Sequence, residues 1–165
     1  MGSVAGNPQG TAPLMPLPEA LRFDMDPCEF AERWLIRIDL AGLLILLSRI
    51  ALQDPELKQL LRAVDLLKII SGFRTKELQE SLGRTGRPTA PDDKSTHRSC
   101  PATGADLRLE GLMDPDNDPI ARKAWLKLGA LAQSIGLRWG GGSRIKPETG
   151  LPVDFNHFDM GPRTP

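Results

Sequence analysis

Apolar residues recur at helical spacing in three stretches of the chain. The stretch from Leu40 to Leu52 is apolar almost throughout and predicts a buried helix. From Leu57 to Leu67, leucine and valine repeat at three- and four-residue steps, which is one face of a helix. Asp54-Pro55 before it supplies a cap and a first helical position. A third helix is expected between Asp118 and Gly136.

Shorter segments with β-branched or alternating residues lie between and after these helices. Strands are expected at Lys68–Phe73, Ala105–Leu109, Leu137–Trp139 and Val153–Met160. Short helices are expected at Asp26–Leu35 and Lys76–Leu82. Helices followed by short strands that are separated by a helix predict an α+β fold with a small antiparallel sheet.

The first 20 residues differ from the rest of the chain in composition. They are rich in Gly, Pro and Ala and show no periodicity, so they are expected to form a flexible or extended arm. The chain has 165 residues, which is enough for one compact domain, and residues 21–165 are assigned to it. Its hydrophobic content of 40% and charged content of 25% are ordinary for a globular protein.

Charge and hydropathy exclude several classes of partner. Lys plus Arg and Asp plus Glu both total 21, so bulk electrostatics predict no nucleic-acid binding. The most apolar run, Leu40–Leu47, is far shorter than the ~20 residues of a membrane span. The N-terminus lacks the basic and apolar regions of a signal peptide, so the chain is expected to be made in the cytoplasm. Cys28 and Cys100 are too few for a disulfide framework, and free thiols are favoured.

The candidate chemistry centres on two histidines, His97 and His157, which are the only ones in the chain. Asp106 follows the first, while Asp154 and Asp159 flank the second. A catalytic zinc site needs three protein ligands and one open position, and a His-Asp-His set meets that requirement. Taken singly, each residue also has an ordinary interpretation, because a loop histidine is usually a surface or capping residue. The spacing has none of the specificity of a motif such as HExxH.

Four segments, taken together and in order, make the pattern more specific. They are Ser71–Thr75, Ser95–His97 leading to Gly104–Leu107, Gly136–Gly141 and Asp154–Phe158. These segments resemble the D-Ala-D-Ala metallopeptidase family, which includes the L-alanyl-D-glutamate peptidases of phage endolysins. The resemblance runs from Ile69 to Met160 and does not cover residues 1 to about 40. It implies a hedgehog/D-Ala-D-Ala peptidase-like fold whose small sheet carries a Zn²⁺ ion.

The resemblance assigns the metal ligands to His97, Asp106 and His157. The step from His97 to Asp106 is nine residues, two more than is usual in the relatives. A loop between Arg98 and Thr103 can absorb such an insertion without moving a strand. Cys100 is an alternative third ligand, because thiolate binds zinc well and His-x-x-Cys can hold it.

The resemblance also implies roles at the catalytic site. Asp154 matches the acidic general base, and Arg74 matches the arginine that binds substrate and steadies developing negative charge. Ser95 matches a residue near the substrate-binding side. Trp139, with the glycines after it, is a candidate for the lining of the cleft, although a Trp beside a short strand more often packs in a core.

The position of Asp154 carries a geometric condition. Residues three apart on a regular strand face opposite ways, so Asp154 and His157 share a site only if Asp154 lies before the regular strand. Pro152 makes an irregular start of that strand plausible. Asp159, two residues after His157, shares its face and is the rival as base or as a partner of the histidine.

The implied function is zinc-dependent hydrolysis of a peptide bond in peptidoglycan stem peptides. The sequence does not separate an L-Ala–D-Glu endopeptidase from a D-Ala-D-Ala carboxypeptidase. The size and the lack of a signal peptide resemble phage lysins or virion-associated hydrolases, which act at the cell wall after release or within a virion. The N-terminal arm favours attachment to such an assembly. The alternative is a structural subunit of a phage tail-like assembly with a zinc site and no peptidase activity. The presence of Asp154 and Arg74 favours the enzyme.

Overall fold

The computed structural model describes residues 14–16, 35–60, 68–72, 74, 76–84, 95–98 and 102–161. Helices and short strands alternate along these segments. The helices are α1 (Ile38–Gln53), α2 (Pro55–Leu60), α3 (Lys76–Arg84), α4 (Pro119–Ser134) and a 3-10 turn at Gly140–Gly142. The strands are β1 (Leu14–Pro16), β2 (Leu35–Arg37), β3 (Lys68–Ser71), β4 (Gly104–Arg108), β5 (Arg138–Trp139) and β6 (His157–Asp159).

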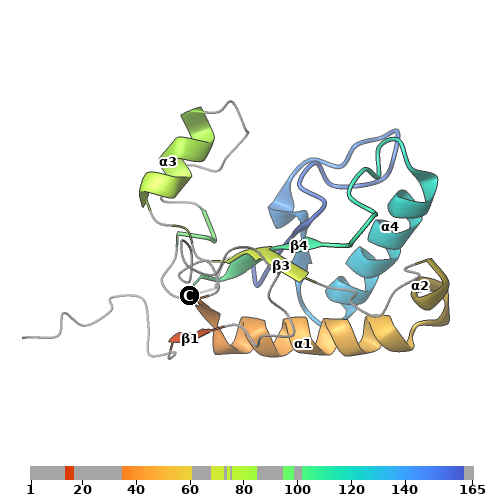
Figure 1. The fold of residues 1–165 in the computed structure, drawn as a ribbon, viewed down its shortest axis with the longest axis horizontal. Helices are drawn as coiled ribbons and strands as arrows, with labels where there is room; N and C mark the ends of the chain where they lie inside the picture. Colours follow the sequence, from red (N-terminus) through yellow and green to blue (C-terminus); the bar gives the residue numbers. More distant parts are fainter. Residues whose placement is uncertain are drawn as a thin grey trace, which may run out of the picture.

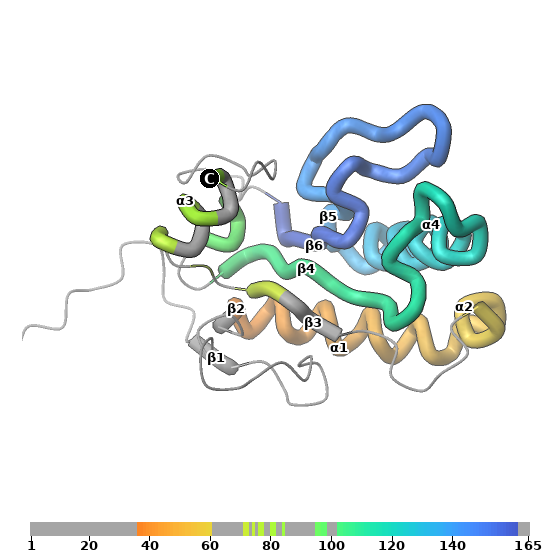
Figure 2. The backbone as a smooth tube through the Cα atoms, turned by 45° about the horizontal axis from the view of Figure 1, so that its top comes forward, coloured from red at the N-terminus to blue at the C-terminus, as the bar shows by residue number. Residues whose placement is uncertain are grey.

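The central feature is a four-stranded antiparallel sheet in the order β3-β4-β6-β5 (Figures 1 and 2). A separate two-stranded sheet joins β1 to β2. The mixture of helices with a small antiparallel sheet confirms the α+β class that the order of the segments predicts.

One face of the sheet packs against α1 and α4. Figure 1 shows α1 running along the bottom of the molecule beneath β3 and β4, with α4 at the right. Ala105 and Leu107 of β4 and Phe158 of β6 belong to the same buried cluster as the apolar faces of both helices. The helical members of that cluster include Leu40, Leu44, Leu47, Ala121, Trp125 and Leu128. The rings of Trp125 and Phe158 stack at 6.4 Å between centroids.

The helix starts follow the capping residues that the sequence predicts. The Asp54 carboxylate accepts hydrogen bonds from the backbone N–H groups of Glu56 and Leu57 at 3.0 and 2.9 Å, which caps α2. The Asp118 carboxylate accepts from Ile120 N–H at 2.8 Å and caps α4. Both helices have proline at their first position, where the missing N–H costs no helical hydrogen bond.

The ends of the chain and of the leucine repeat are described only in part. Leu14–Pro16, within the expected arm, forms β1 and pairs with β2, whereas residues 1–13 and 17–20 lie outside the described residues. The short helix expected at 26–35 falls outside them as well, except for Leu35, which begins β2. Helix α2 ends at Leu60, and residues 61–67 of the expected helix are not among those described.

The last strand is shorter than the sequence predicts. The expectation of a strand over Val153–Met160 is wrong at both ends, since β6 covers only His157–Asp159 and residues 153–156 form a turn. The backbone N–H of Val153 donates to Arg144 O at 2.8 Å, and that of Asp154 donates to Ser143 Oγ at 3.1 Å. Because the preceding loop takes these donors, they do not join the sheet.

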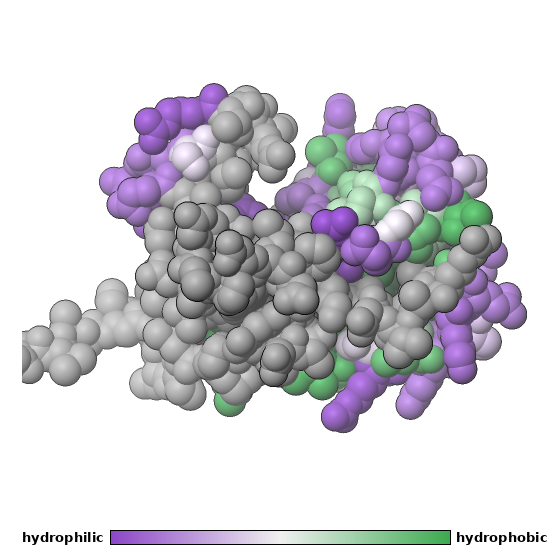
Figure 3. Space-filling model, in the orientation of Figure 1, coloured by the Kyte–Doolittle hydropathy of each residue, from purple (hydrophilic) through white to green (hydrophobic). Residues whose placement is uncertain are grey.

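The described side chains of α3 are mostly hydrophilic, as the purple colour at the upper left of Figure 3 shows. Among the described residues, no helix has both the length and the apolar character needed to cross a membrane. The exposed large apolar side chains include Ile38 and Leu46 on α1 and Ile145 and Val153 in the loop before β6.

Candidate metal centre

The pairing of β4 with β6 brings two of the expected ligands together. Asp106 lies directly opposite His157 in this antiparallel pair, and Ser71 of β3 lies opposite Asp106 on its other side. Side chains directly opposite one another share a face, and their Cβ atoms are about 4.5–5.5 Å apart. Ala105 and Phe158, one residue away, point to the helical side instead.

The third expected ligand, His97, comes from a turn at Thr96–Arg98. Its carbonyl accepts a hydrogen bond from Arg74 N–H at 2.8 Å, and the Thr96 carbonyl accepts from Thr103 N–H at 3.0 Å. The His97 ring is fixed by Nδ1, which is 2.6 Å from the carbonyl oxygen of Gly72. The turn is therefore held both to β3 and to the start of β4.

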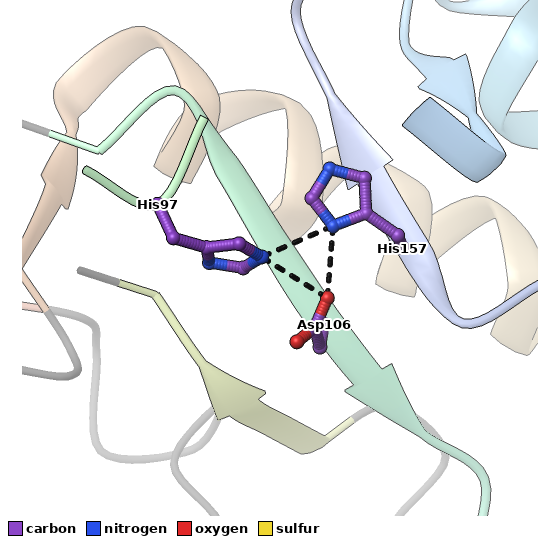
Figure 4. Close-up of side chains that lie close together, drawn as sticks. All are labelled: His97, Asp106 and His157. Carbon is purple, nitrogen blue, oxygen red and sulfur yellow. Dashed lines mark hydrogen bonds and ion pairs between the residues drawn. The ribbon is translucent and has the colours of Figure 1, made fainter. Parts of the chain in front are cut away.

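Three side-chain atoms meet at one point (Figure 4). His97 Nε2 is 3.1 Å from His157 Nδ1 and 3.2 Å from Asp106 Oδ1, and the last two atoms are 2.8 Å apart. Tetrahedral ligands bound at about 2.0–2.1 Å to a zinc ion are about 3.3 Å apart. The three residues are buried, with 4%, 5% and 9% exposure for His97, His157 and Asp106. The three ligand atoms are therefore spaced so that one cation could bind to all of them with little rearrangement.

The other nitrogen of each ring fixes which atoms face the centre. A backbone carbonyl only accepts, so His97 Nδ1 carries the proton that Gly72 O receives, and the Nε2 lone pair points to the centre. His157 Nε2 is 3.1 Å from the Asp159 carboxylate, which also only accepts. With both rings neutral, three acceptors converge with no donor between them. Such an arrangement requires a positive charge at the centre.

The pKa values of the site reflect the same requirement. Burial opposes ionisation of Asp106, but the two histidines hold its pKa well below the usual value. Burial also disfavours the charged form of His157, yet hydrogen bonds with Asp106 and Asp159 raise its pKa to about 9. Without a metal ion, a proton on His157 thus supplies the positive charge that a cation would otherwise supply. Among the described residues, His97, Asp106 and His157 form a group able to hold a metal ion.

Two glycines leave room for the histidine at the centre. A Cβ on Gly104 would lie 2.3 Å from Thr96 Oγ1 and 2.9 Å from His157 Cε1, so a side chain there would collide with the site. Gly141 has a φ of 59°, in the left-handed region, and a Cβ on it would lie 3.0 Å from His157 Cδ2. The sequence shows these glycines within the resembling segments, but only the tertiary structure shows what they make room for.

Arg74 contacts the metal-ligand candidate Asp106 directly. Its Nη2 donates to Asp106 Oδ2, the carboxylate oxygen that does not face the histidines. Its Nε donates to Ser71 Oγ at 2.9 Å. The structure thus brings Arg74 to the site, where it holds the ligand carboxylate by one oxygen and leaves the other directed at the histidines.

Asp159 contacts His157 from the opposite side of the ring. It also accepts two hydrogen bonds, both of 2.8 Å, from Nε and Nη2 of Arg138 on β5. Burial would raise its pKa, but the bonds from His157 and Arg138 lower it to about 2. Asp159 was predicted from the sequence as a partner of the histidine, whereas Arg138 was not. The available signal was the spacing His-x-Asp on one strand with an arginine on its neighbour.

Asp154 lies in the turn that precedes β6, which meets the geometric condition for sharing the site. Its carbonyl accepts a hydrogen bond from His157 N–H at 3.1 Å. The residue is exposed, but partial desolvation of its carboxyl and then the charge of Asp106 raise its pKa. The charges of both histidines and of Arg74 act in the opposite direction. Asp154 therefore lies within electrostatic reach of all three candidate ligands.

The remaining site candidates are placed less centrally. Ser95 is buried and begins the turn of His97, where its carbonyl accepts from Arg98 N–H at 3.0 Å. Trp139 lies opposite Phe158, on the helical side of the sheet, so the structure does not bring it to the face of His157. Its indole N–H donates to Phe155 O at 2.6 Å, and its ring fills the space beside Gly129 of α4. Cys100, the alternative ligand, lies outside the described residues, as does Cys28.

Comparison with known proteins adds no assignment. No protein-family model matches the sequence, and no curated protein matches it. The assignment of function therefore depends on the residues of the site and their geometry.

Proposed function

We propose that the protein is a zinc-dependent peptidase that hydrolyses a peptide bond in peptidoglycan stem peptides. The bond is either the L-Ala–D-Glu bond, which an endopeptidase cleaves, or the D-Ala-D-Ala bond, which a carboxypeptidase cleaves. The observation that carries the proposal is the convergence of His97 Nε2, His157 Nδ1 and Asp106 Oδ1 on one point, 2.8–3.2 Å apart. The four segments that resemble the D-Ala-D-Ala metallopeptidase family contain these residues and support the choice of reaction.

The donor set favours zinc among the common biological metals. Two imidazole nitrogens and one carboxylate oxygen suit Zn²⁺, whereas Mg²⁺ and Ca²⁺ prefer oxygen ligands alone. Three protein ligands leave the fourth position of a tetrahedral ion open, which is the arrangement of catalytic zinc sites. A zinc ion held by these residues would lower the pKa of a bound water and polarise the substrate carbonyl.

Asp154 is the proton carrier of the proposed mechanism. Its carboxylate takes a proton from the attacking water and passes it to the leaving amine. Partial desolvation and the charge of Asp106 raise its pKa, which brings the carboxyl closer to the pH at which it must both accept and release a proton. Its exposed position in the turn before β6 leaves it accessible to a substrate.

Arg74 is the positive group that faces the developing negative charge. The guanidinium has five N–H donors, of which one on Nε binds Ser71 and one on Nη2 binds Asp106. Its fork suits an oxyanion or a substrate carboxylate. Ser95, next to the turn of His97, remains the predicted contact on the substrate-binding side.

The proposed place of action is the bacterial cell wall. A phage lysin reaches peptidoglycan after release from the cytoplasm, and a virion-associated hydrolase is carried to it within the particle. The Gly- and Pro-rich N-terminal arm favours attachment to such a particle.

A second candidate is a structural subunit of a phage tail-like assembly that keeps the zinc site for stability. The burial of all three ligands favours it, because a structural metal site is closed to solvent. The two candidates differ in Asp154 and Arg74, since a structural site has no use for an acid poised beside the metal. Their joint presence supports the enzyme.

Metal analysis coupled to digestion of purified muropeptides tests the proposal. The protein is expected to carry one zinc per chain and to cleave the stem peptide, with both properties lost to a chelator and restored by zinc. Mass spectrometry of the products distinguishes cleavage after L-Ala from release of the terminal D-Ala. Zinc without cleavage would support the structural candidate, and absence of both would overturn the metal site.

The choice of Asp154 over Asp159 as the base is tested by substitution. Asp154→Asn is expected to lower the turnover number by about 10²–10⁴ with zinc retained, the usual contribution of a general base. Glu148→Gln is the matched control, because Glu148 is an exposed acid in the same loop. Wild-type turnover in Asp154→Asn would end the assignment.

A further inference from the structure

Asp159 is the most deeply buried charged residue beside the candidate metal centre, with 0% exposure. Its carboxylate accepts from Arg138 Nε and Nη2 at 2.8 Å each and from Gly161 N–H at 2.6 Å. It also lies 3.1 Å from His157 Nε2. A buried carboxylate is costly unless it is paired and hydrogen-bonded, and these partners compensate the burial of Asp159 beside His157.

We propose that Asp159 is a positioning residue that fixes the tautomer and the orientation of His157 for metal binding through Nδ1, and that Arg138 holds Asp159 in place. The inference rests on the metal site of the proposed function. It assigns no contact with substrate to either residue.

The groups that surround His157 Nε2 determine the tautomer of the ring. Thr96 Oγ1 also lies 3.1 Å from this nitrogen, but a hydroxyl can donate or accept and so accommodates either tautomer. The Asp159 carboxylate only accepts, so it requires a proton on Nε2. With that proton in place, the lone pair of a neutral ring is on Nδ1, the atom that faces His97 and Asp106. A carboxylate in this position also makes the ligating nitrogen more basic.

Contacts from β5 and from Gly141 hold the carboxylate and the ring in place. Arg138 lies directly opposite Asp159 in the β5–β6 pair and binds both carboxylate oxygens in a fork. The Arg138 side chain is 37% exposed, so water partly hydrates its charge. The Asp159 side chain is 0% exposed, so its charge has no contact with bulk water. The backbone of Gly141 closes the other side, since a Cβ there would lie 3.0 Å from His157 Cδ2 and 3.6 Å from Asp159 Oδ2. The carboxylate is thus fixed on β6, and it holds the His157 ring through Nε2 while Nδ1 faces His97 and Asp106.

The test measures zinc affinity by competition with a chromogenic chelator in the full-length protein. Removal of a carboxylate partner of a metal-bound histidine typically costs 10–100-fold in metal affinity. Asp159→Ala is expected to lose affinity in this range. Asp159→Asn is expected to lose less, because its amide oxygen still accepts from Nε2–H. Arg138→Met is expected to lose less zinc affinity than Asp159→Ala, because the carboxylate is still present but lacks its two hydrogen bonds from Arg138.

The matched control is Asp39→Asn. Asp39 also accepts a forked pair of hydrogen bonds from an arginine, Arg37, and one from a backbone N–H, but it lies in the first turn of α1 and these bonds join it to no ligand candidate. This variant is expected to bind zinc as the wild-type protein does. Electronic absorption of the cobalt-substituted proteins provides a readout that a general loss of stability would not move, because it reports the ligand geometry of folded molecules.

The outcomes separate this inference from the proposed function. A wild-type protein that binds no zinc would overturn the metal site and this role with it. Wild-type zinc binding together with affinities of Asp159→Asn and Asp159→Ala within twofold of the control would overturn the positioning role alone. If Asp159→Ala does not fold, Asp159→Asn and Arg138→Met decide the question. An unchanged cobalt spectrum and unchanged affinity in both would count against the proposal.

Discussion

The two faces of the β4–β6 pair are both buried, but they differ in chemistry. On one face, Ala105 and Phe158 pack into the apolar cluster with α1 and α4. On the other face, Asp106 and His157 lie opposite each other, with Asp159 further along β6. Successive residues of a single three-residue strand therefore serve opposite purposes.

The difference shows which face stabilises the folded state by burial and which face destabilises it unless its charges are compensated. Full burial of a large apolar side chain stabilises the folded state by about 1.5–3 kcal/mol. Burial of an ion costs several kcal/mol unless a partner and hydrogen bonds compensate it. On the polar face, Arg74 and Arg138 provide partners for the two aspartates, but the convergent acceptors still require a positive charge. We infer that the apolar face maintains the geometry of the polar one.

The largest effect is expected on the apolar face. Phe158→Ala should lower the free energy of unfolding by about 3–5 kcal/mol, because it removes a fully buried aromatic ring and leaves a cavity beside Trp125. Urea denaturation in the presence of a chelator measures this loss. The folded fraction should still bind zinc, since the ligands point to the other face. Phe158→Leu is the milder control, and a loss smaller than 1 kcal/mol in the alanine variant would contradict the division of the two faces.

The neighbouring residue is expected to show the reverse behaviour. His157→Ala should weaken zinc binding by at least about 100-fold, because structural sites bind zinc by about 10–16 kcal/mol shared among their ligands. Its unfolding free energy with chelator present should change less than that of Phe158→Ala. Chelator competition and urea denaturation measure the two quantities. Zinc affinity equal to that of the wild type would show that the converging atoms are not ligands.

Of the two faces of the β4–β6 pair, the polar one carries the titratable groups, so a change of pH is expected to act there. In the metal-free protein, the pKa of His157 is raised to about 9, so at pH 7 zinc must displace a proton. Apparent zinc affinity should therefore rise about tenfold per pH unit between about pH 6 and 9. The sign for metal-free stability is the opposite, since a raised pKa stabilises the fold below pH 6.5 and this contribution is lost as pH rises through 9. A zinc affinity independent of pH would contradict the proton assigned to His157.

Substitution of Arg74 is expected to change zinc affinity less than substitution of His157, and it tests which of two roles Arg74 has. If it acts mainly by holding Asp106, Arg74→Lys should weaken zinc binding by about tenfold, since the fork to Ser71 and Asp106 is lost. If it acts mainly on the developing oxyanion, the turnover number should fall while zinc content stays complete. We expect both, with the loss of turnover larger. Lys76→Arg, at an exposed position on α3, is the control for exchanging an ammonium and a guanidinium group away from the site.

The smallest effect is expected in the helical layer away from the sheet. Asp118→Ala removes the N-cap of α4 and should cost about 1 kcal/mol of stability. Zinc affinity should not change, because α4 packs on the apolar face. A thermal melt and a chelator titration check this. A changed zinc affinity would mean that the two faces are coupled more strongly than their packing indicates.

The helices were predictable because their signals are local. The apolar run of α1, the caps Asp54 and Asp118 and the prolines after them depend only on residues close in sequence. The length of β6 was not predictable, because a strand needs a partner. Only Gly104–Asp106 of β4 pairs with it, and the loop before β6 takes the donors of Val153 and Asp154.

The residues available for chemistry can be read from the sequence. The chain has only two histidines, and the four resembling segments place both of them and name Asp106, Asp154 and Arg74 as their companions. A bend before the last strand was expected only on the condition that Asp154 and His157 share a site, and the predicted strand over Val153–Met160 did not show it. The strand register, the direction of each ring nitrogen and the packing of Trp139 against α4 depend on residues far apart in the chain. Long-range packing sets them, because hydrogen-bond partners such as Gly72 O for His97 and Arg138 for Asp159 lie far away in the sequence and local spacing does not reveal them.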